Sequence, residues 1–379
     1  MPIYLDNNAT TPLEPEVREV MLRYFDLEYG NAGSRTHEFG YRANKAVQLA
    51  REQIATLAGT DPSEVIFTSG ATEANNLAIL GLAEHGRRTG RQHLVTTAIE
   101  HKAVLEPMKV LESQGFELTL VGVGKSGRVL PEDVIAAVRD DTLLVSVMHA
   151  NNETGILQPI DEIASGLKNH TAYFHVDAVQ GFGKDLESPR HARIDMLSVS
   201  AHKLFGPKGV GALIARRRGY ERPPLKPLMF GGGQERALRP GTLPVPLIAG
   251  FGAAAAIAMR DHLLRRNASF TERQLALKEF EPLKPILIGD QSHALGHVLT
   301  LGFTGVDSEA LMLALRDDVA ISNGSACTSA RREASHVLTA MGLDHETIES
   351  IVRLSWSHLQ PPTPWHELAK AISGLNILV

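Results

Sequence analysis

The stretch Asp195-Met-Leu-Ser-Val-Ser-Ala-His-Lys-Leu-Phe-Gly-Pro-Lys-Gly-Val-Gly211 joins an apolar, strand-like run to a turn rich in glycine and proline. Lys203 lies between His202 and this turn. An amine held beside a second basic group and small residues can be desolvated, which lowers its pKa and lets it attack a carbonyl. The stretch is therefore a candidate site for an aldehyde cofactor held as a Schiff base. The alternative is that Lys203 is a solvated loop lysine.

Outside this stretch, short apolar runs typical of buried strands alternate with segments whose apolar residues recur every three or four positions. This alternation predicts a mostly parallel sheet covered by helices, with ligand-binding groups at the carboxyl ends of the strands. The predicted strands are residues 65–68, 93–97, 117–123, 143–148 and 172–176, and the predicted helices are residues 15–24, 38–58, 77–83, 131–138 and 160–167.

The pattern changes near residue 247. An alanine-rich helical segment continues from there to about residue 280, and the remainder has α+β character, with predicted strands at residues 298–303 and 352–355. We expect three parts: an N-terminal segment 1–13 that packs with the small domain, a large domain 14–255 and a small domain 256–379. A chain of 379 residues is long enough for two domains.

Composition excludes several classes of protein. Apolar residues make up 43% of the chain and charged residues 21%, which is typical of a globular enzyme, and the net charge of -5 gives no reason to expect nucleic-acid binding. The apolar run 246–259 is too short to span a membrane and is typical of a buried helix, and the first residues lack the plan of a signal peptide. A single cysteine allows neither an intrachain disulfide nor a cysteine-rich metal site, so we expect a cytoplasmic protein without a structural metal.

Two polar residues follow strand ends in a way that suggests chemistry. Asp177 comes directly after a predicted strand, close to where Lys203 emerges, and a carboxylate there could pair with the nitrogen of a pyridine ring. His101 follows the strand at 93–97, where an imidazole could stack on a ring and move protons. The alternatives are that Asp177 caps the next turn and that His101 is a structural histidine.

Other polar runs predict anion binding. The segment 69–76, Ser-Gly-Ala-Thr-Glu-Ala-Asn-Asn, joins a strand to a helix, and amide groups at a helix start can bind phosphate. Its hydroxyls could equally be simple helix caps. The segment 149–155 could bind a carboxylate or form an Asn/Gly turn. The basic loop at residues 231–242 could reach a phosphate or merely connect elements.

Cys327 lies in the run Ser322-Asn-Gly-Ser-Ala-Cys-Thr-Ser-Ala330. Small and hydroxylated neighbours are unlike the apolar surroundings that a structural cysteine prefers. They favour a reactive thiol, and the start of a following helix would favour its thiolate form.

Taken together, these motifs resemble the pyridoxal-phosphate-dependent cysteine desulfurases of the NifS/IscS type, within the class V aminotransferases. The matching stretches occur in the order found in that family and extend from residue 4 to about residue 355. They are YLDNNATT, TSGATEANN, EHKAV, HANNETG, HVDAVQ, SAHKLFGPKG, GGGQER and GSACTS.

The resemblance implies pyridoxal phosphate (PLP) fold type I and a role for each matching residue. Lys203 would hold the cofactor and shuttle the Cα proton, and Cys327 would accept sulfur. His101 would stack on the ring and serve in proton transfer, with Asp177 at the ring nitrogen and Gln180 at the phenolic oxygen. The remaining implied contacts are Ala71, Thr72, Ser200 and His202 with the phosphate, Thr242 with the phosphate of a partner subunit, and Asn152 and Arg353 with the substrate carboxylate.

The implied activity converts L-cysteine to L-alanine and leaves a persulfide on Cys327, from which sulfur passes to an acceptor protein. The resemblance also implies a homodimer, and it leaves iron–sulfur assembly, tRNA thiolation and DNA phosphorothioation as possible destinations of the sulfur. The alternatives are a selenocysteine lyase or small-substrate aminotransferase on the same fold, and a non-catalytic docking subunit.

The sequence departs from the family pattern at three places. Pro240 stands where a serine is usual, Asn323 replaces a common serine, and the chain ends at Val379 without the longer tail with which housekeeping members meet their scaffold. Pro240 implies that one hydroxyl near the partner's phosphate is missing, and the shorter tail leaves the identity of the acceptor open.

Overall fold

The computed structural model describes residues 2–323 and 334–375. Its centre is a seven-stranded sheet in the order β2-β8-β7-β6-β5-β3-β4. All neighbouring strands are parallel except β8, which runs antiparallel to both β2 and β7. The strands are β2 Val65–Thr68, β3 His93–Thr97, β4 Glu117–Val121, β5 Thr142–Met148, β6 Tyr173–Asp177, β7 Met196–Ser200 and β8 Gly211–Ala215. The prediction of a mostly parallel, helix-covered sheet is therefore confirmed.

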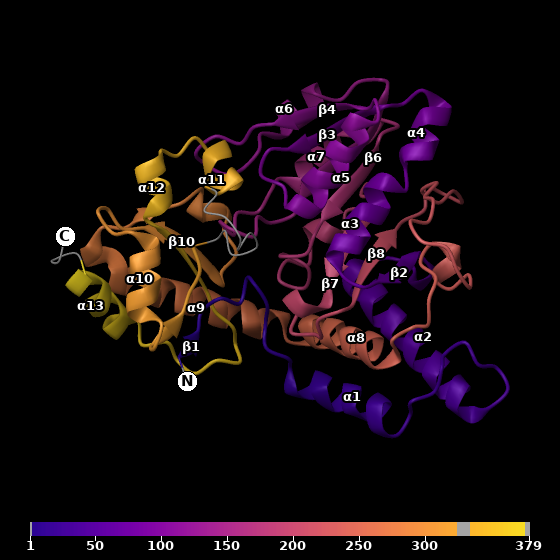
Figure 1. Cartoon of the computed structure of the whole chain (residues 1–379), viewed down its shortest axis with the longest axis horizontal. Helices are drawn as coiled ribbons and strands as arrows, with labels where there is room; N and C mark the ends of the chain where they lie inside the picture. The colour runs from indigo at the N-terminus through magenta and orange to yellow at the C-terminus, as the bar shows by residue number, and fades with distance from the viewer. Residues whose placement is uncertain (1, 324–333, 376–379) are drawn as a thin grey trace.

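Helices cover both faces of this sheet (Figure 1). Because successive strand residues point to opposite faces, Ile66 and Leu94 pack in one apolar cluster and their neighbours Phe67 and Val95 in another. The first cluster includes residues of α3 Ala71–Leu80 and α5 Lys102–Ser113, and the second includes residues of α2 Glu38–Ala58, α6 Pro131–Ala136, α7 Ile160–Gly166 and α8 Val245–Arg260. Burial on both faces explains why inner strands such as β5 and β8 are largely apolar in sequence.

The helices at the N-terminal end follow local sequence signals. Helix α1 Pro15–Asp26 begins with proline, whose missing N–H costs nothing in the first turn. Helix α2 begins after His37, whose side chain accepts a hydrogen bond from the Gly40 amide, and ends at Gly59 in a left-handed conformation with φ of 65°. Helix α4 Ala83–Thr89 also ends at a glycine, Gly90.

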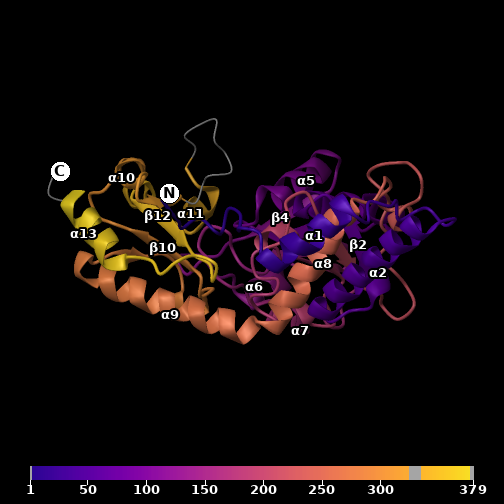
Figure 2. The ribbon, with the colours of Figure 1, turned by 90° about the horizontal axis from the view of Figure 1, so that it is seen from below.

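A second, smaller group of elements surrounds an antiparallel sheet in the order β12-β10-β9. Figure 2 shows these elements beside the large sheet, with α9 running along their length and α13 lying against it. The elements are α9 His262–Phe280, β9 Ile286–Leu287, β10 Val298–Gly302, α10 Ser308–Leu315, β11 Val319–Ala320, α11 His336–Ala340, α12 His345–Glu349, β12 Ile351–Ser355 and α13 Trp365–Leu375. Strand β1 Ile3–Tyr4 pairs in parallel with β11, and Asp6 bridges to Ser355. The division at residues 13 and 255 stays a prediction.

The long helical stretch after residue 245 is broken at Asp261. Helices α8 and α9 are bent there by 74°. Among the described residues, no single helix has the length and apolar character needed to cross a membrane, and this bent pair meets the test only when its two parts are combined.

Candidate active site

A cavity of about 440 Å³ lies at the carboxyl ends of the central strands, where residues 8–10 cross this edge of the sheet. Parallel strands bring the residues that follow them to one edge, so motifs far apart in sequence meet in this cavity. The predicted site residues that line it are Ala71, Thr72, His101, Asn152, Asp177, Gln180, Ser200, His202, Lys203 and Arg353.

Lys203 occupies a short 3-10 turn, Ala201–Lys203, directly after β7. Its amine donates hydrogen bonds to the backbone oxygens of Asn8 and Ala9, the second at 2.8 Å. The next residue but one, Phe205, has a positive φ of 61°, and its amide is bonded to the Thr11 hydroxyl at 3.0 Å. The turn is thus held from both sides, and it places a lysine amine in the cavity.

Asp177 is the last residue of β6, and its carboxylate is buried. Asn75 Nδ2 donates to Oδ2 at 2.7 Å, and the Val179 amide donates to Oδ1 at 3.1 Å. These two donors fix the plane of the carboxylate. An anchored carboxylate of this kind can hold a protonated heterocyclic nitrogen.

His101 has both of the roles that the sequence left open. It caps α5, because Nδ1 accepts a hydrogen bond from the Ala103 amide at 3.0 Å, and it also lines the cavity. This contact puts the proton of the neutral ring on Nε2. Burial lowers the pKa of His101, with Asp177 acting in the opposite sense and Lys203 in the same sense. The ring is therefore neutral near pH 7 and can donate from Nε2.

The start of α3 and the end of β7 form one end of the cavity. Thr72 and Ser200 present hydroxyl groups that make no hydrogen bond to other described residues. His202 lies beside them, and burial together with Lys203 lowers its pKa to about 4, so its ring is neutral. Strand β8 approaches closely here: a Cβ on Gly211 would lie 2.8 Å from the backbone of Gly70. Unpaired hydroxyls at a helix start suit a phosphate.

Arg353 and Asn152 form another wall. The Arg353 guanidinium, carried by β12, is paired with Asp6 and donates to the backbone oxygen of Asn152 at 2.8 Å. Asn8 Nδ2 donates to the same oxygen at 3.0 Å. Arg353 is only 3% exposed, and its Nε has no partner among the described residues. A buried guanidinium with an unused donor suits a small carboxylate.

The residues present fit pyridoxal phosphate. The cavity offers an amine, a fixed carboxylate, a neutral imidazole and unpaired hydroxyls at a helix start. In addition, the buried Oε1 of Gln180 has no hydrogen-bond partner among the described residues, while its Nε2 donates to the Asn8 oxygen at 3.1 Å. Lys203 would hold the aldehyde end, Asp177 the ring nitrogen, and Thr72 and Ser200 the phosphate.

One predicted residue that the structure describes does not line this cavity. Thr242 lies on an exposed segment after residue 240 and does not line the cavity of its own chain. Cys327 lies outside the described residues.

Sequence reasoning missed the contributions of three residues. Asn8 lies in the motif YLDNNATT and Asn75 in TSGATEANN, but the sequence pattern gave no indication of the hydrogen bonds that their side chains make. Glu100, next to His101, is fully buried and receives hydrogen bonds from Thr97 and the Met148 amide. Burial raises the pKa of Glu100 to about 8. The Thr-x-x-Glu spacing at the strand end was the available signal.

Comparison with known proteins agrees with this geometry. Residues 3–360 match the family model described as aminotransferase class-V. The chain is 48% identical to a cysteine desulfurase IscS of Anaeromyxobacter sp. (strain Fw109-5) over 360 residues, covering 93% of this chain and 87% of the relative. Among solved structures, it resembles a NifS-like protein with a TM-score of 0.91 and 36% identity over the whole of both chains. It also resembles DndA from Streptomyces lividans, with a TM-score of 0.82 and 47% identity, covering 92% of this chain and 98% of the other.

Proposed function

The chain belongs to the aminotransferase class-V family as a pyridoxal-phosphate-dependent cysteine desulfurase. We propose that its active site is the cavity of about 440 Å³ at the carboxyl ends of the central strands. L-Cysteine is the substrate, and L-alanine is the carbon product. The single observation that supports this location best is the meeting of Lys203, Asp177 and His101 in one cavity at the carboxyl edge of the sheet.

When bound, pyridoxal phosphate withdraws electrons from the substrate Cα, so that a Cα proton can leave. The chain supplies the groups that make this possible. Asp177, held by Asn75 and the Val179 amide, keeps a proton on the ring nitrogen. Arg353 and Asn152 orient the substrate carboxylate, in competition with the ion pair between Arg353 and Asp6.

Lys203 and His101 are proposed to move protons. The Lys203 Nζ takes the proton from the substrate Cα, because the amine is the flexible base of the cavity once it leaves the oxygens of Asn8 and Ala9. His101 is neutral and carries its proton on Nε2, so it can donate to a substrate or product atom. Closely spaced groups with different proton affinities allow both transfers at neutral pH.

Cys327 is proposed as the sulfur acceptor, on the basis of its small and hydroxylated sequence neighbours and the family resemblance. Its thiolate attacks the substrate Sγ, the Sγ–Cβ bond breaks, and the electron pair stays on carbon. Protonation of that carbon completes alanine, and the sulfur atom remains on Cys327 as a persulfide. We also propose a reducing, cytoplasmic setting, because the one cysteine of the chain would then be kept available for this role.

The persulfide is proposed to pass its sulfur to an acceptor protein of iron–sulfur assembly, tRNA thiolation or DNA phosphorothioation. To separate the three pathways, the enzyme is loaded with ³⁵S-cysteine and then mixed with acceptor proteins of each pathway. Transfer of label to one acceptor in preference to the others identifies the pathway.

A homodimer is proposed from the surface of the large domain. Tyr29, Tyr41, Tyr220 and Phe230 are exposed, the last two at 100% and 90%. They lie on segments at the end of the molecule farthest from the small domain (Figure 1). Exposed large aromatic side chains at one end of a molecule favour a protein interface there. Thr242 is proposed to reach the phosphate site of the partner subunit across this interface.

The activity is tested by incubating the purified protein with L-cysteine, pyridoxal phosphate and a thiol reductant. We expect alanine and sulfide in equal amounts, with alanine limited to about one turnover per active site when the reductant is omitted. Alanine without sulfide in the presence of reductant, or turnover that does not require pyridoxal phosphate, would overturn the proposal.

A further inference from the structure

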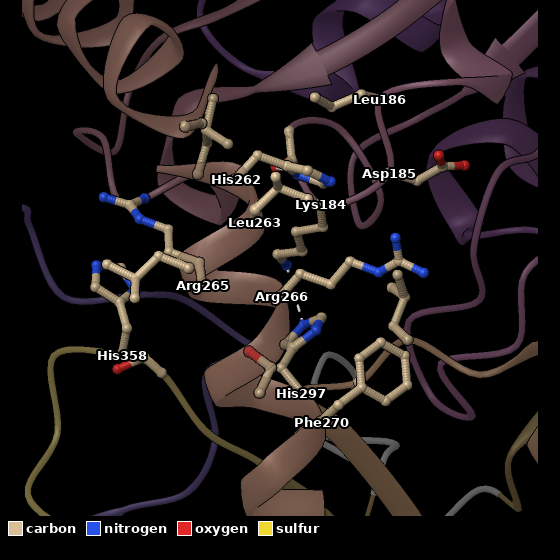
Figure 3. Close-up of a pocket in the computed structure, with 18 of the residues that line it drawn as sticks. Lys184, Asp185, Leu186, His262, Leu263, Arg265, Arg266, Phe270, His297 and His358 are labelled. Atoms are coloured by element: carbon tan, nitrogen blue, oxygen red, sulfur yellow. Dashed lines mark hydrogen bonds between the residues drawn. The ribbon is translucent and has the colours of Figure 1, made fainter. Parts of the chain in front are cut away.

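A second cavity, about 910 Å³ in volume, lies where α8 ends and α9 begins, and Lys184 is one of its lining residues (Figure 3). Lys184 follows β6 by seven residues, within the turn that also contains Gln180. Its Nζ lies 3.1 Å from Nε2 of His297, the contact drawn as a dashed line in Figure 3. The mechanism above does not use this amine.

Lys184 has no carboxylate partner among the described residues. Asp185, its neighbour in sequence, is paired instead with His149 at 2.9 Å. Glu187 lines the same cavity but is exposed. Burial, together with a smaller effect of Lys203, lowers the pKa of Lys184 to about 7. A partly buried amine without a carboxylate partner is expected to give up its proton readily.

The other titratable groups around the cavity come from several elements, and three of them, His262, Arg265 and Arg266, are on α9. Arg265 is paired with Glu14, and Arg260, at the end of α8, is paired with Glu16. Arg266 lies over the ring of Phe270. The cavity is also lined by the imidazoles of His262 and His358. The two paired arginines are thus balanced by carboxylates, and Lys203 is the cation that favours the neutral form of Lys184.

The hydrogen-bond pattern leads to the same protonation state by an independent route. Asn8 donates from Nδ2 to the Asn152 oxygen, so its Oδ1 is the atom that lies 3.0 Å from His297 Nε2. An amide oxygen can only accept, so Nε2 must carry a proton. A charged ammonium can only donate and would need a lone pair on that same nitrogen. The two contacts are compatible when Lys184 is neutral.

Proton uptake by Lys184 therefore has a consequence at the first cavity. The His297 proton must then move to the other ring nitrogen, and the bond from Nε2 to Asn8 is lost. Asn8 is the residue whose backbone oxygen accepts from both Lys203 and Gln180. The contacts thus run from Lys184 through His297 and Asn8 to the proposed catalytic amine.

We propose that Lys184 is a positioning residue for Lys203, acting through the side chain of His297 and through Asn8, and that its charge sets the pH at which the Lys203 end of the bound cofactor titrates. The proposal rests on the proposed role of Lys203. In this proposal the second cavity binds no ligand. It gives the Lys184 amine access to water, with which the amine exchanges protons.

The test is a pH titration of the absorbance of the holoenzyme, with the cofactor content measured at each pH. Lys184→Met abolishes the charge that Lys184 takes up below about pH 7, so the titration midpoint is expected to rise by about 0.5 to 1 pH unit. Lys184→Arg makes the charge permanent, so the midpoint is expected to fall. Lys168→Met, at an exposed lysine, is the matched control and should leave the midpoint unchanged.

Opposite shifts in the two Lys184 variants support the proposal, because a purely structural role would not give shifts of opposite sign. Equal midpoints in the wild type and both variants, at full cofactor content, would overturn it. If the variants do not fold, competitive labelling of amines in the wild-type holoenzyme provides the second measurement. Lys184 should then titrate near neutral pH, and titration above about pH 9, as for a solvated lysine, would overturn the proposal.

The proposed function fails in a different way. If Lys203→Ala retains the absorbance band and pH response of the wild type, the role of Lys203 is wrong, whatever the Lys184 variants do. If the band depends on Lys203 and the Lys184 variants match the wild type, only the inference about Lys184 is wrong.

Discussion

The amide Nδ2 of Asn75 lies 2.7 Å from the carboxylate Oδ2 of Asp177. Asn75 is in the second turn of α3, whose start forms the proposed phosphate site, and Asp177 ends β6, where the ring nitrogen is proposed to lie. One hydrogen bond thus ties the two ends of the cofactor site together. The bond joins residues 102 positions apart in sequence, and each of them belongs to a separate motif.

Asn75→Ala should weaken cofactor binding. The Asp177 carboxylate keeps its backbone donor but loses a buried side-chain donor, and we expect the Kd of pyridoxal phosphate to rise about tenfold. Fluorescence titration of the apoprotein measures this directly. Asn76→Ala is the matched control, since within the described residues that amide donates to the backbone oxygen of Thr72 in the same helix and not to Asp177. An unchanged Kd in Asn75→Ala would show that this bond does not support the site.

Glu100 gives a prediction about stability and pH. Its pKa is raised to about 8 by burial, whereas in the unfolded chain it titrates near 4.5. Between these values the folded state holds a proton that the unfolded state has released, so the contribution of Glu100 is full below about pH 4.5 and is lost as pH rises through 8. Glu100→Gln keeps an oxygen for Thr97 and Met148 but removes this titration.

We therefore expect Glu100→Gln to gain stability relative to the wild type as pH rises from 5 to 8, by on the order of a few kcal/mol. Urea unfolding at intervals of pH measures the difference. Parallel stability curves for the two proteins would mean that Glu100 is ionised in the folded state.

Arg353→Lys should affect substrate binding more than turnover. The guanidinium uses separate nitrogens for Asp6 and Asn152, and an ammonium cannot reproduce that fork. We expect the KM for L-cysteine to rise about tenfold or more, with a smaller change in kcat. The control is Arg273→Lys, at a buried arginine that contacts Val298 and Gln291 outside the cavity. It should lower stability and leave KM unchanged, and equal effects of both variants on KM would contradict a specific role for Arg353.

Cys327→Ser separates cofactor chemistry from sulfur transfer. We expect the variant to bind pyridoxal phosphate with the absorbance of the wild type. Its rate of sulfide release should fall about a hundredfold or more, because a hydroxyl does not replace a thiolate as the attacking group. Sulfide assays with matched cofactor content provide the measurement. Sulfide production at the wild-type rate would rule out Cys327 as the acceptor.

Much of the sheet and of the cavity could be predicted from sequence because the relevant signals are local. Residues 38–58 have helical periodicity and are followed by Gly59, and the helix has these bounds. Strand ends in a parallel sheet share one edge, so Asp177, Lys203 and His101 could be placed near one another from the order of strands and polar turns alone.

The remaining features depend on contacts that no local pattern encodes. The contact between Asn8 and His297 joins residues 289 positions apart and forms only when the N-terminal segment crosses between the two sheets. Helix α5 was not predicted, since Pro107 lies inside it and disfavours a helix locally, yet burial of Val104, Met108 and Leu111 stabilises it. The bend at Asp261 also escaped prediction, because the helical periodicity continues through it.

The central claim is that the Lys203 amine is the group that holds the cofactor. Reduction of the holoenzyme with borohydride, followed by proteolysis and mass spectrometry of the peptides, tests it most directly. We predict one reduced pyridoxyl phosphate group per chain, on the peptide that contains Lys203 and at that residue. A group fixed on Lys184 or Lys208 instead, or no covalent attachment in a protein that releases sulfide from L-cysteine, would contradict the account.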